Sequence, residues 1–353
     1  MKALPTHPEK ILIRSTNWIG DAVMTTPAVR TIRESFPESE ITLLANPWVS
    51  DVFRFSPRID HLMVYEKKGR HKGLRGMLQL ANELREKRFD CAILLQNAFE
   101  AAFITWMAGI PVRAGYTTDG RGLLLTHGVH KTIEAVKKHE VNYYQRIMLG
   151  LGLRPSINEL ELFISGDQID AMKARVRGLM DIEFGSQPLI GFNPGAAFGP
   201  AKRWPPEKYA ELAQLICRDN RARIVLFGSE ADRSTCTDII AQSGSAAPRM
   251  LNLAGATSLV EAMALIGECD VFVTNDSGLM HVAAALHTPL VAIFGSTDHI
   301  ATGPYSDHAV IIRKPLPCSP CKKTHCPKKH FRCMKLIDSD EVYEAVTTLF
   351  KGQ

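Results

Sequence analysis

Short apolar runs rich in β-branched residues alternate with helical patterns along this chain. In the first half, four runs have the length and composition of buried strands: 10–14, 41–45, 61–65 and 91–95. Helical patterns lie between them, at 28–36, 48–55 and 74–87. Strands that alternate with helices form parallel βαβ units, so this half predicts an open parallel sheet covered by helices.

The second half of the chain repeats this scheme. Its predicted strands are 189–192, 223–227, 270–274 and 290–294, and its predicted helices are 209–218, 235–242, 259–269 and 279–286. A polar stretch with a helical centre, 165–188, separates the halves and indicates a linker. A chain of 353 residues is also too long for one ordinary core.

We therefore predict an α/β protein of two Rossmann-like domains, residues 1–165 and 166–353. In such folds the loops at the carboxyl ends of the strands bind ligands, and we expect the two parallel sheets to face a central cleft.

The first predicted strand runs into the segment Ser15–Asp21, and a helix follows. This segment has one glycine, Gly20, and no G-x-G-x-x-G pattern, which disfavours an NAD-dependent dehydrogenase or epimerase. Asp21 could accept a proton from a hydroxyl group in a cleft. It could equally cap the helix, with Thr26-Pro27 as a second helix start, and the residues alone favour the cap.

The string 273–281, V-T-N-D-S-G-L-M-H, joins a predicted strand to an apolar helix. The free N–H groups of Ser277, Gly278 and Leu279 would form an anion site at the positive end of the helix dipole. The plainer interpretation is that Asp276 and Ser277 cap the helix and that His281 is a core residue. From the residues alone, the anion site and the plain helix cap are about equally well supported.

A glycine-rich loop, 193–205, crosses the top of the same domain. Lys202 and Arg203 in this loop could neutralise a pyrophosphate, although most such pairs are simply solvated. After the next strand, Glu230 in F-G-S-E could accept both hydroxyls of a ribose. On its own, one glutamate after a predicted strand is weak evidence for a ribose site.

Four strings resemble, in order and spacing, the ADP-heptose:lipopolysaccharide heptosyltransferase family: W-I-G-D-A-V-M-T-T-P-A-V, N-P-G-A-A-F-G-P-A-K-R-W-P, F-G-S-E and N-D-S-G-L-M-H. The resemblance spans nearly the whole chain. Two further strings, 108–116 and 119–126, resemble heptosyltransferase II rather than heptosyltransferase I.

The resemblance implies an inverting, metal-independent transferase of the two-Rossmann (GT-B) architecture. Such an enzyme moves L-glycero-D-manno-heptose from ADP-heptose to the lipopolysaccharide inner core, here heptose I on Kdo-lipid A. Acceptor binding is then expected in the first domain and ADP-sugar binding in the second. A transferase of type I or III, or a nucleotide-sugar-binding protein without transfer activity, is the alternative.

The resemblance also assigns residues. Asp21 matches the general base and Lys202 the phosphate-binding lysine. The implied donor-binding residues are Gly195, Ala196, Lys202, Glu230, Asp276, Ser277, Gly278, Leu279 and His281. Some relatives have threonine hydroxyls where this chain has Ala196 and Ala197, so any phosphate contact there must come from backbone N–H groups. The expected acceptor-binding residues are Asn17, Trp18, Arg75, Arg113 and Arg121.

Four cysteines crowd into one segment: Cys318, Cys321, Cys326 and Cys333. The C-x2-C-x4-C-x6-C spacing could hold one structural zinc ion, or the segment could be a basic loop with reduced thiols. The other four are scattered through apolar or helical segments and predict buried free thiols. The resemblance implies that catalysis needs no cofactor, and the D-x-D string at 338–340 is interpreted as the cap of a C-terminal helix rather than as a metal–nucleotide site.

A net charge of +5 is too small to indicate a nucleic-acid-binding protein, but it suits a phosphorylated substrate or an anionic membrane surface. The N-terminus lacks the pattern of a secretory signal, and the longest apolar stretches are shorter than a bilayer span. We expect a cytoplasmic protein that is at most peripheral to the inner membrane.

Overall fold

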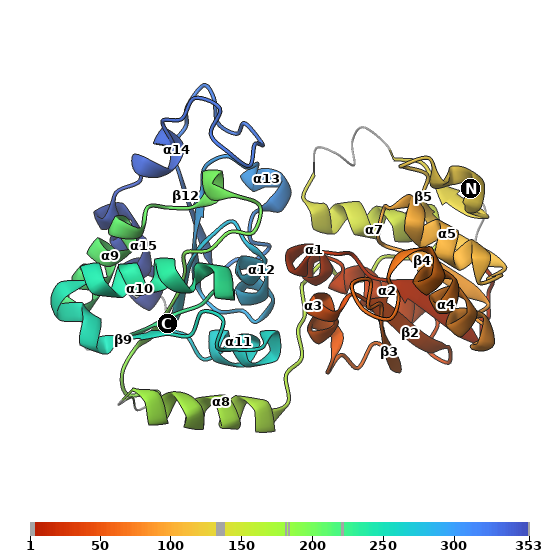
Figure 1. The fold of residues 1–353 in the computed structure, drawn as a ribbon, viewed down its shortest axis with the longest axis horizontal. Coiled ribbons are helices and arrows are strands. Elements are labelled where there is room, and N and C mark those ends of the chain that lie inside the picture. Colours follow the sequence, from red (N-terminus) through yellow and green to blue (C-terminus); the bar gives the residue numbers. More distant parts are fainter. Residues whose placement is uncertain (1–3, 132–137, 181, 183, 220–221, 352–353) are drawn as a thin grey trace. The chain divides into compact units, whose positions relative to one another are not determined.

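Each half of the chain folds around its own six-stranded sheet (Figure 1). The computed structural model describes residues 4–131, 138–180, 182, 184–219 and 222–351. The chain divides into two units, Met1–Phe163 and Ile164–Gln353. The predicted α/β class with two Rossmann-like parallel sheets is confirmed.

The sheet of the first unit has the strand order β3-β2-β1-β4-β5-β6 and parallel pairings. Its strands are β1 (Lys10–Arg14), β2 (Glu40–Ala45), β3 (His61–Val64), β4 (Cys91–Leu94), β5 (Val112–Tyr116) and β6 (His127–Val129). Its helices are α1 (Ile19–Met24), α2 (Thr26–Ser35), α3 (Pro47–Ser50), α4 (Gly73–Glu86), α5 (Phe99–Met107) and α7 (Glu140–Gly150), with 3-10 turns η1 (Asp51–Phe53) and η2 (Arg121–Leu124). The four strands predicted for this half are present.

The central strand of this sheet is buried on both faces. Ile11, Leu12 and Ile13 are each fully buried, which explains why the strand is a continuous apolar run. Leu12 belongs to a core that includes Leu80 of α4 and Ile104 of α5. Ile11 and Ile13 point to the opposite face because side chains alternate along a strand.

The sheet of the second unit has the order β12-β11-β10-β7-β8-β9, again with parallel pairings. Its strands are β7 (Leu189–Asn193), β8 (Arg223–Leu226), β9 (Met250–Asn252), β10 (Val271–Asn275), β11 (Leu290–Phe294) and β12 (Ala309–Arg313). Its helices are α8 (Gly166–Leu179), α9 (Pro206–Asp219), α10 (Arg233–Gln242), α11 (Leu259–Ile266), α12 (Gly278–Ala285), α13 (His299–Thr302), α14 (Arg332–Lys335) and α15 (Ser339–Lys351), with 3-10 turns η3 (Pro200–Lys202), η4 (Glu230–Asp232) and η5 (Gly244–Arg249).

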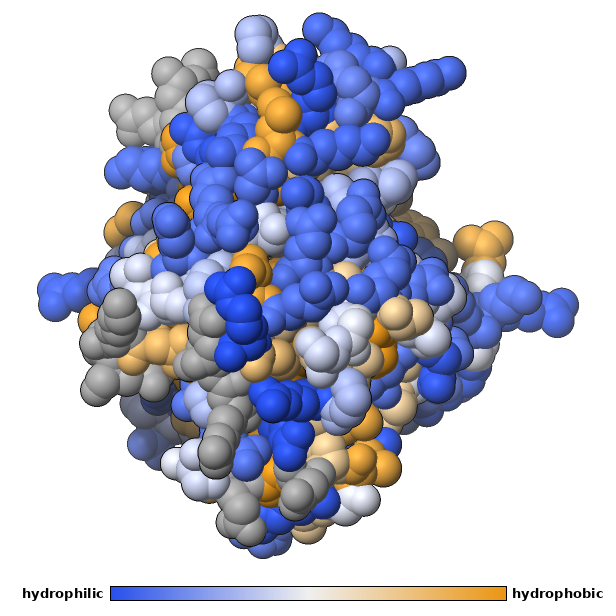
Figure 2. Space-filling view, turned by 90° about the vertical axis from the view of Figure 1, so that its left-hand side faces the viewer, coloured by the Kyte–Doolittle hydropathy of each residue, from blue (hydrophilic) through white to orange (hydrophobic). Residues whose placement is uncertain are grey.

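One core of this unit lies between the sheet and the helices α9, α10 and α15. Tyr209, Ile239 and Val342 from these helices pack with Phe192 of the central strand. The surface on that side of the molecule is mainly hydrophilic (Figure 2). The apolar residues of α9 and α10 are therefore buried in the core, as expected of amphipathic surface helices.

One segment differs from the sequence prediction: the single helix expected at 48–55 is a short helix, α3, followed by the turn η1. The linker, predicted with a helical centre, contains α8, which packs against α11 (Figure 1). Arg175 of α8 pairs with Glu261 of α11, and Lys173 pairs with Glu268 just after α11. Among the described residues, no helix is both long and apolar enough to span a membrane.

Candidate active site

The strand order of the second unit reverses at β7. β10 lies on one side of β7 and β8 on the other, so the chain winds outward in both directions from this strand. Doubly wound sheets bind ligands at the carboxyl edge beside such a switch point. Three segments with predicted donor-binding residues reach this edge: 194–205 after β7, 227–230 after β8, and 276–277 after β10.

Lys202 and Asp276 form a buried ion pair at this edge. Lys202 Nζ lies 2.6 Å from Asp276 Oδ2, and the two side chains are 13% and 5% exposed. Thr297, in the loop after β11, donates its hydroxyl to the same carboxylate oxygen at 2.5 Å. Lys202 Nζ also lies 4.8 Å from the ring centroid of Phe198. An ammonium group has three donors, so this lysine can engage an anion in addition to the carboxylate.

Ser277 is the N-cap of α12, and its hydroxyl is fixed from two sides. It accepts the Met280 N–H at 3.4 Å and a bond from Asn193 Nδ2 at 2.6 Å. The capping interpretation is therefore right for Ser277, whereas Asp276 is engaged by the lysine. His281 is buried in the helix, as the core interpretation expects. The first turn of α12 lies at the carboxyl end of β10, where the helix dipole favours an anion.

The loop after β7 is tied to β10 at both ends. Asn275 accepts the Trp204 N–H at 3.0 Å and donates to the Pro194 carbonyl at 2.7 Å. A Cβ atom at Gly195 would lie 2.7 Å from the carboxylate of Asp232, so a larger residue does not fit there. The packing of the loop thus explains this glycine without a ligand.

Asp232 is a charged residue at this edge that the sequence analysis missed. Its carboxylate accepts the N–H and the hydroxyl of Ser229, at 3.0 and 2.7 Å, and lies 3.4 Å from Arg203. The capping-box spacing of Ser229 and Asp232 is the sequence signal that predicts this arrangement. Glu230, the predicted ribose ligand, is 72% exposed and lies 2.9 Å from Arg233, so its carboxylate is accessible.

In the first unit, Asp21 lies in the first turn of α1. Trp18 occupies the N-cap position and makes no side-chain capping bond, so the interpretation of Asp21 as the cap is wrong. The second helix start is confirmed, because α2 begins at Thr26 with a proline in its first turn.

A second carboxyl group, that of Glu140, lies near Asp21. Glu140 is the first residue of α7, which packs against α1. Burial raises the pKa of Glu140, and the negative charge of Asp21 raises it further. Burial and the same charge also raise the pKa of Tyr144. Two carboxyl groups in such an environment tend to differ in protonation, as acid–base sites require. No string around Glu140 marks it in the sequence, because tertiary packing alone brings it to α1.

Asn17 and Trp18 occupy the loop between β1 and α1. Asn17 Oδ1 accepts a bond from Asn46 Nδ2 at 2.7 Å, and its carbonyl accepts the Trp48 indole N–H at 2.8 Å. Arg14 also reaches Asn17, at 3.3 Å, and burial lowers the pKa of this guanidinium to about 10. Trp18 of this loop is 63% exposed, and Trp48 of α3, which donates to the loop, is 45% exposed.

The structure corrects the expectation that Arg121 meets an acceptor. Its guanidinium is fully buried, donates to the Tyr116 carbonyl and to Asn97 Oδ1, each at 2.7 Å, and burial lowers its pKa to about 10. Arg113 likewise donates to two backbone carbonyls, at 2.6 and 2.5 Å. Both arginines hold β5 and its neighbours together, whereas Arg75 is exposed at the start of α4.

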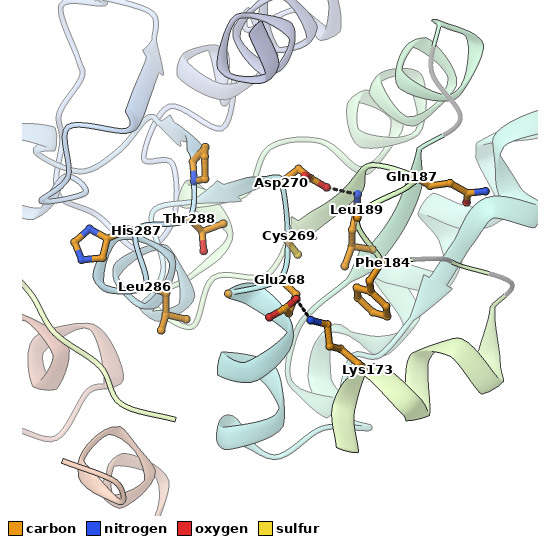
Figure 3. Close-up of a pocket in the computed structure, with 13 residues that line it drawn as sticks. Lys173, Phe184, Gln187, Leu189, Glu268, Cys269, Asp270, Leu286, His287 and Thr288 are labelled. Carbon is orange, nitrogen blue, oxygen red and sulfur yellow. Dashed lines mark hydrogen bonds and ion pairs between the residues drawn. The ribbon is translucent and has the colours of Figure 1, made fainter. Parts of the chain in front are cut away.

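A cavity of about 410 Å³ lies at the opposite, amino edge of the second sheet (Figure 3). Lys173 and Glu268 pair beside it at 2.5 Å, and Asp270 accepts the Leu189 N–H at 2.7 Å. The residues that line it include none of the predicted site residues. Ligands of such folds bind at the carboxyl edge, so we do not assign this cavity to the active site.

The eight cysteines are free thiols. Cys91, Cys236 and Cys269 are buried, as predicted, and burial raises the pKa of Cys91 and Cys236 to about 12. Cys217 is half-buried. The cysteines of the cluster, Cys318, Cys321, Cys326 and Cys333, line one small cavity. As placed, the described histidine, cysteine and carboxylate side chains form no group of three that could hold a metal ion.

Residues 77–332 match the family described as glycosyltransferase family 9 (heptosyltransferase), and this segment is well over half of the chain. The chain belongs to glycosyltransferase family 9. It is 35% identical to lipopolysaccharide heptosyltransferase 2 of Salmonella typhimurium over 312 residues, which cover 86% of this chain and 88% of that protein.

Two solved structures agree with this family 9 fold. ADP-heptose lps heptosyltransferase II of E. coli is 32% identical, with a TM-score of 0.82 over 97% of this chain and 99% of that chain. A family 9 glycosyl transferase of Veillonella parvula is 25% identical, with a TM-score of 0.86 over the whole of both chains. The predicted family and the prediction of a glycosyltransferase are thereby confirmed.

Proposed function

We propose that this family 9 chain transfers L-glycero-D-manno-heptose from ADP-heptose to heptose I on Kdo-lipid A, with inversion and without a metal ion in catalysis. The observation that carries this proposal is the buried pair of Lys202 and Asp276 beside the first turn of α12. The names of the relatives, heptosyltransferase 2 and ADP-heptose heptosyltransferase II, support the choice of donor and reaction.

In this proposal the donor diphosphate lies between Lys202 and the N–H groups of residues 277–279. Lys202 neutralises the charge that develops on the diphosphate as the sugar leaves, and the dipole of α12 adds to this stabilisation. Asp276, released in part from the lysine by the incoming anion, would accept hydroxyl groups of the heptose. Glu230 would accept the ribose hydroxyls, since its carboxylate is exposed. Gly195 and Ala196 would contribute backbone N–H groups only.

The reaction balances with Asp21 as the base. The acceptor hydroxyl oxygen attacks the anomeric carbon from the side opposite the diphosphate, and its proton passes to the Asp21 carboxylate. The bond between the anomeric carbon and the diphosphate oxygen breaks, and ADP leaves with that electron pair. Glu140 supports this assignment, because burial and the charge of Asp21 both raise its pKa and so disfavour a second ionised carboxylate beside Asp21.

Acceptor binding is proposed for the loop that carries Asn17 and Trp18, with Arg75 as a cation for the phosphorylated core. Indole rings stack on sugar faces, and arginine binds phosphate in a bidentate way. We propose that exposed apolar residues of α4, α5 and η2 make a peripheral contact with the inner membrane. α5 packs against both α4 and η2. The exposed apolar residues are Leu74, Leu78, Phe99, Trp106 and Leu123.

Release of ADP tests the proposal. A heptosyltransferase releases ADP from ADP-heptose only when the acceptor is present, whereas a nucleotide-sugar-binding protein binds the donor without turnover. Acceptors of different core length distinguish a type II enzyme from types I and III. Rapid ADP release with Kdo-lipid A that lacks heptose I would replace the type II assignment.

A further inference from the structure

The cysteine cluster surrounds a cavity next to the candidate donor site. Cys318, Cys321, Cys326 and Cys333 line this cavity together with Ser296, His330 and Ala201. Its volume is about 20 Å³, and a void of about 10–15 Å³ already holds one water-sized guest. Four cysteines therefore line a space for a single small guest.

The backbone of the cysteine loop is held in an unusual conformation. Three non-glycine residues of the loop, Lys322, Lys329 and Phe331, have φ between 49° and 58°. Such backbone conformations are costly and persist where the surroundings impose them, often at functional sites.

A buried polar atom also faces this cavity. Ser296 is 1% exposed, and its hydroxyl has no hydrogen-bond partner among the described residues. On the other side, His330 Nε2 lies 4.0 Å from Cys318 Sγ. A thiolate accepts hydrogen bonds, so both groups are suited to support sulfur ligands from outside the coordination shell.

We infer that Cys318, Cys321, Cys326 and Cys333 bind one zinc ion, and that this metal-held loop positions Lys202 and Asp276 in the donor site. Tetrahedral zinc takes four thiolates at about 2.3 Å. The sulfurs as placed do not yet form such a group. Rotation of a cysteine between χ1 rotamers moves its sulfur by roughly 3 Å, enough to bring ligands that share one small cavity onto a common ion.

The cysteine loop contacts the segment that carries Lys202 and the segment that carries Thr297, the hydroxyl partner of Asp276. On the lysine side, the Thr324 carbonyl accepts the Ala201 N–H at 3.0 Å. A Cβ atom at Gly199 would lie 2.5 Å from the same carbonyl oxygen, so the two loops touch directly.

On the carboxylate side, the Lys322 N–H bonds to the Ser296 carbonyl at 2.6 Å, and Lys322 Nζ lies 3.1 Å from Asp298. Thr297, between these two residues, is the one that donates to Asp276. An ion that fixes the cysteine loop thus restricts the segments that carry the lysine and the hydroxyl partner of the carboxylate. The effect on donor binding rests on the proposed function of Lys202.

The first experiment measures the metal itself. Full-length protein purified without a histidine tag is analysed for zinc, and its thiols are titrated before and after treatment with a chelator. We expect about one zinc per chain and four thiols that become reactive when the metal is removed. Replacement of zinc by cobalt(II) should give the intense thiolate-to-cobalt absorption of a four-sulfur site. Protein without bound metal that takes up neither zinc nor cobalt would overturn the metal site.

The second experiment measures ADP binding by calorimetry, with and without metal, for wild type and Cys321→Ser. Cys217→Ser is the matched control, because Cys217 is a half-buried free thiol outside the cluster. Loss of the metal should lower the affinity for ADP about tenfold, which is less than the full loss of a charge-assisted contact. Cys217→Ser should leave the affinity for ADP unchanged.

The outcomes separate the two proposals. Zinc binding with unchanged ADP affinity would overturn the role of the loop in positioning the lysine, provided that Lys202→Ala still weakens ADP. If Lys202→Ala also leaves ADP binding unchanged, the proposed donor site fails while the zinc site stands. Should Cys321→Ser not fold, chelation of the wild type gives the same comparison.

Discussion

Replacement of Lys202 by alanine removes the only ammonium group placed against Asp276 among the described residues. The lysine is 13% exposed and the carboxylate 5% exposed, so little solvent screens the charge that is left behind. A charge-assisted contact to the diphosphate contributes about 1.5–3 kcal/mol, which corresponds to a ten- to hundredfold loss of ADP affinity. The orphaned carboxylate also repels the diphosphate, so we expect a value near the upper end.

Adenosine provides the comparison, because it lacks the diphosphate and should lose little affinity. Calorimetric titration of both ligands against wild type, Lys202→Ala and the control Lys208→Ala measures the difference. Lys208 is paired with Glu211 at 3.2 Å on the surface of α9 and should have no effect on either ligand. Equal weakening of ADP and adenosine by Lys202→Ala would refute the phosphate role. The variant should also be less stable, by about 3 kcal/mol, and Lys202→Ala with Asp276→Asn should recover part of this loss.

Three further predictions concern the first unit. Asp21→Asn should lower the transfer rate by about 10²–10⁴ while ADP affinity stays unchanged and the urea midpoint does not fall; a near-normal rate would remove Asp21 from the role of base. Arg75→Ala should raise the acceptor KM. Arg121→Met should instead lower the free energy of unfolding by about 3 kcal/mol, because it leaves buried carbonyl groups unpaired. An acceptor KM that changes only in Arg121→Met would show that Arg121, and not Arg75, binds the acceptor. Glu140→Gln should raise the stability at pH 7, since a carboxyl group with a raised folded-state pKa costs stability once the pH exceeds its unfolded pKa of about 4.5. This gain should vanish below pH 4, and urea unfolding at the two pH values checks it.

The sequence predicted eight of the twelve strands that the described residues form and missed β5, β6, β9 and β12. Parallel strands that are buried on both faces leave a strong local signal. Residues 11–13 and 271–273 are consecutive apolar residues that are all fully buried, so these runs stand out without any tertiary information. The carboxyl end of β10 then places the loop that carries Asp276. Lys202 and Asp276 were predicted separately, as phosphate ligand and sugar ligand, and the fold brings them to 2.6 Å.

The failures came from residues whose role depends on distant partners. Arg121 has the sequence appearance of a surface cation, yet it satisfies carbonyl groups around β5 that are not local in sequence. Asp21 is of a residue type that often caps helices, but α1 begins at Ile19 with Trp18 in the N-cap position, so Asp21 lies in the first turn. Glu140 is 119 residues from Asp21 in sequence, and no short motif can report such a contact.

Acceptor-dependent release of ADP tests the central claim most directly. Purified chain is mixed with ADP-heptose, with and without Kdo-lipid A that carries heptose I, and ADP is measured over time. The product is checked by mass spectrometry for one added heptose. We predict steady ADP release and a singly extended product only when the acceptor is present, with both lost in Asp21→Asn. Donor binding without acceptor-dependent ADP release, in protein shown to be folded, would contradict the assignment of this chain as a heptosyltransferase that acts on the inner core.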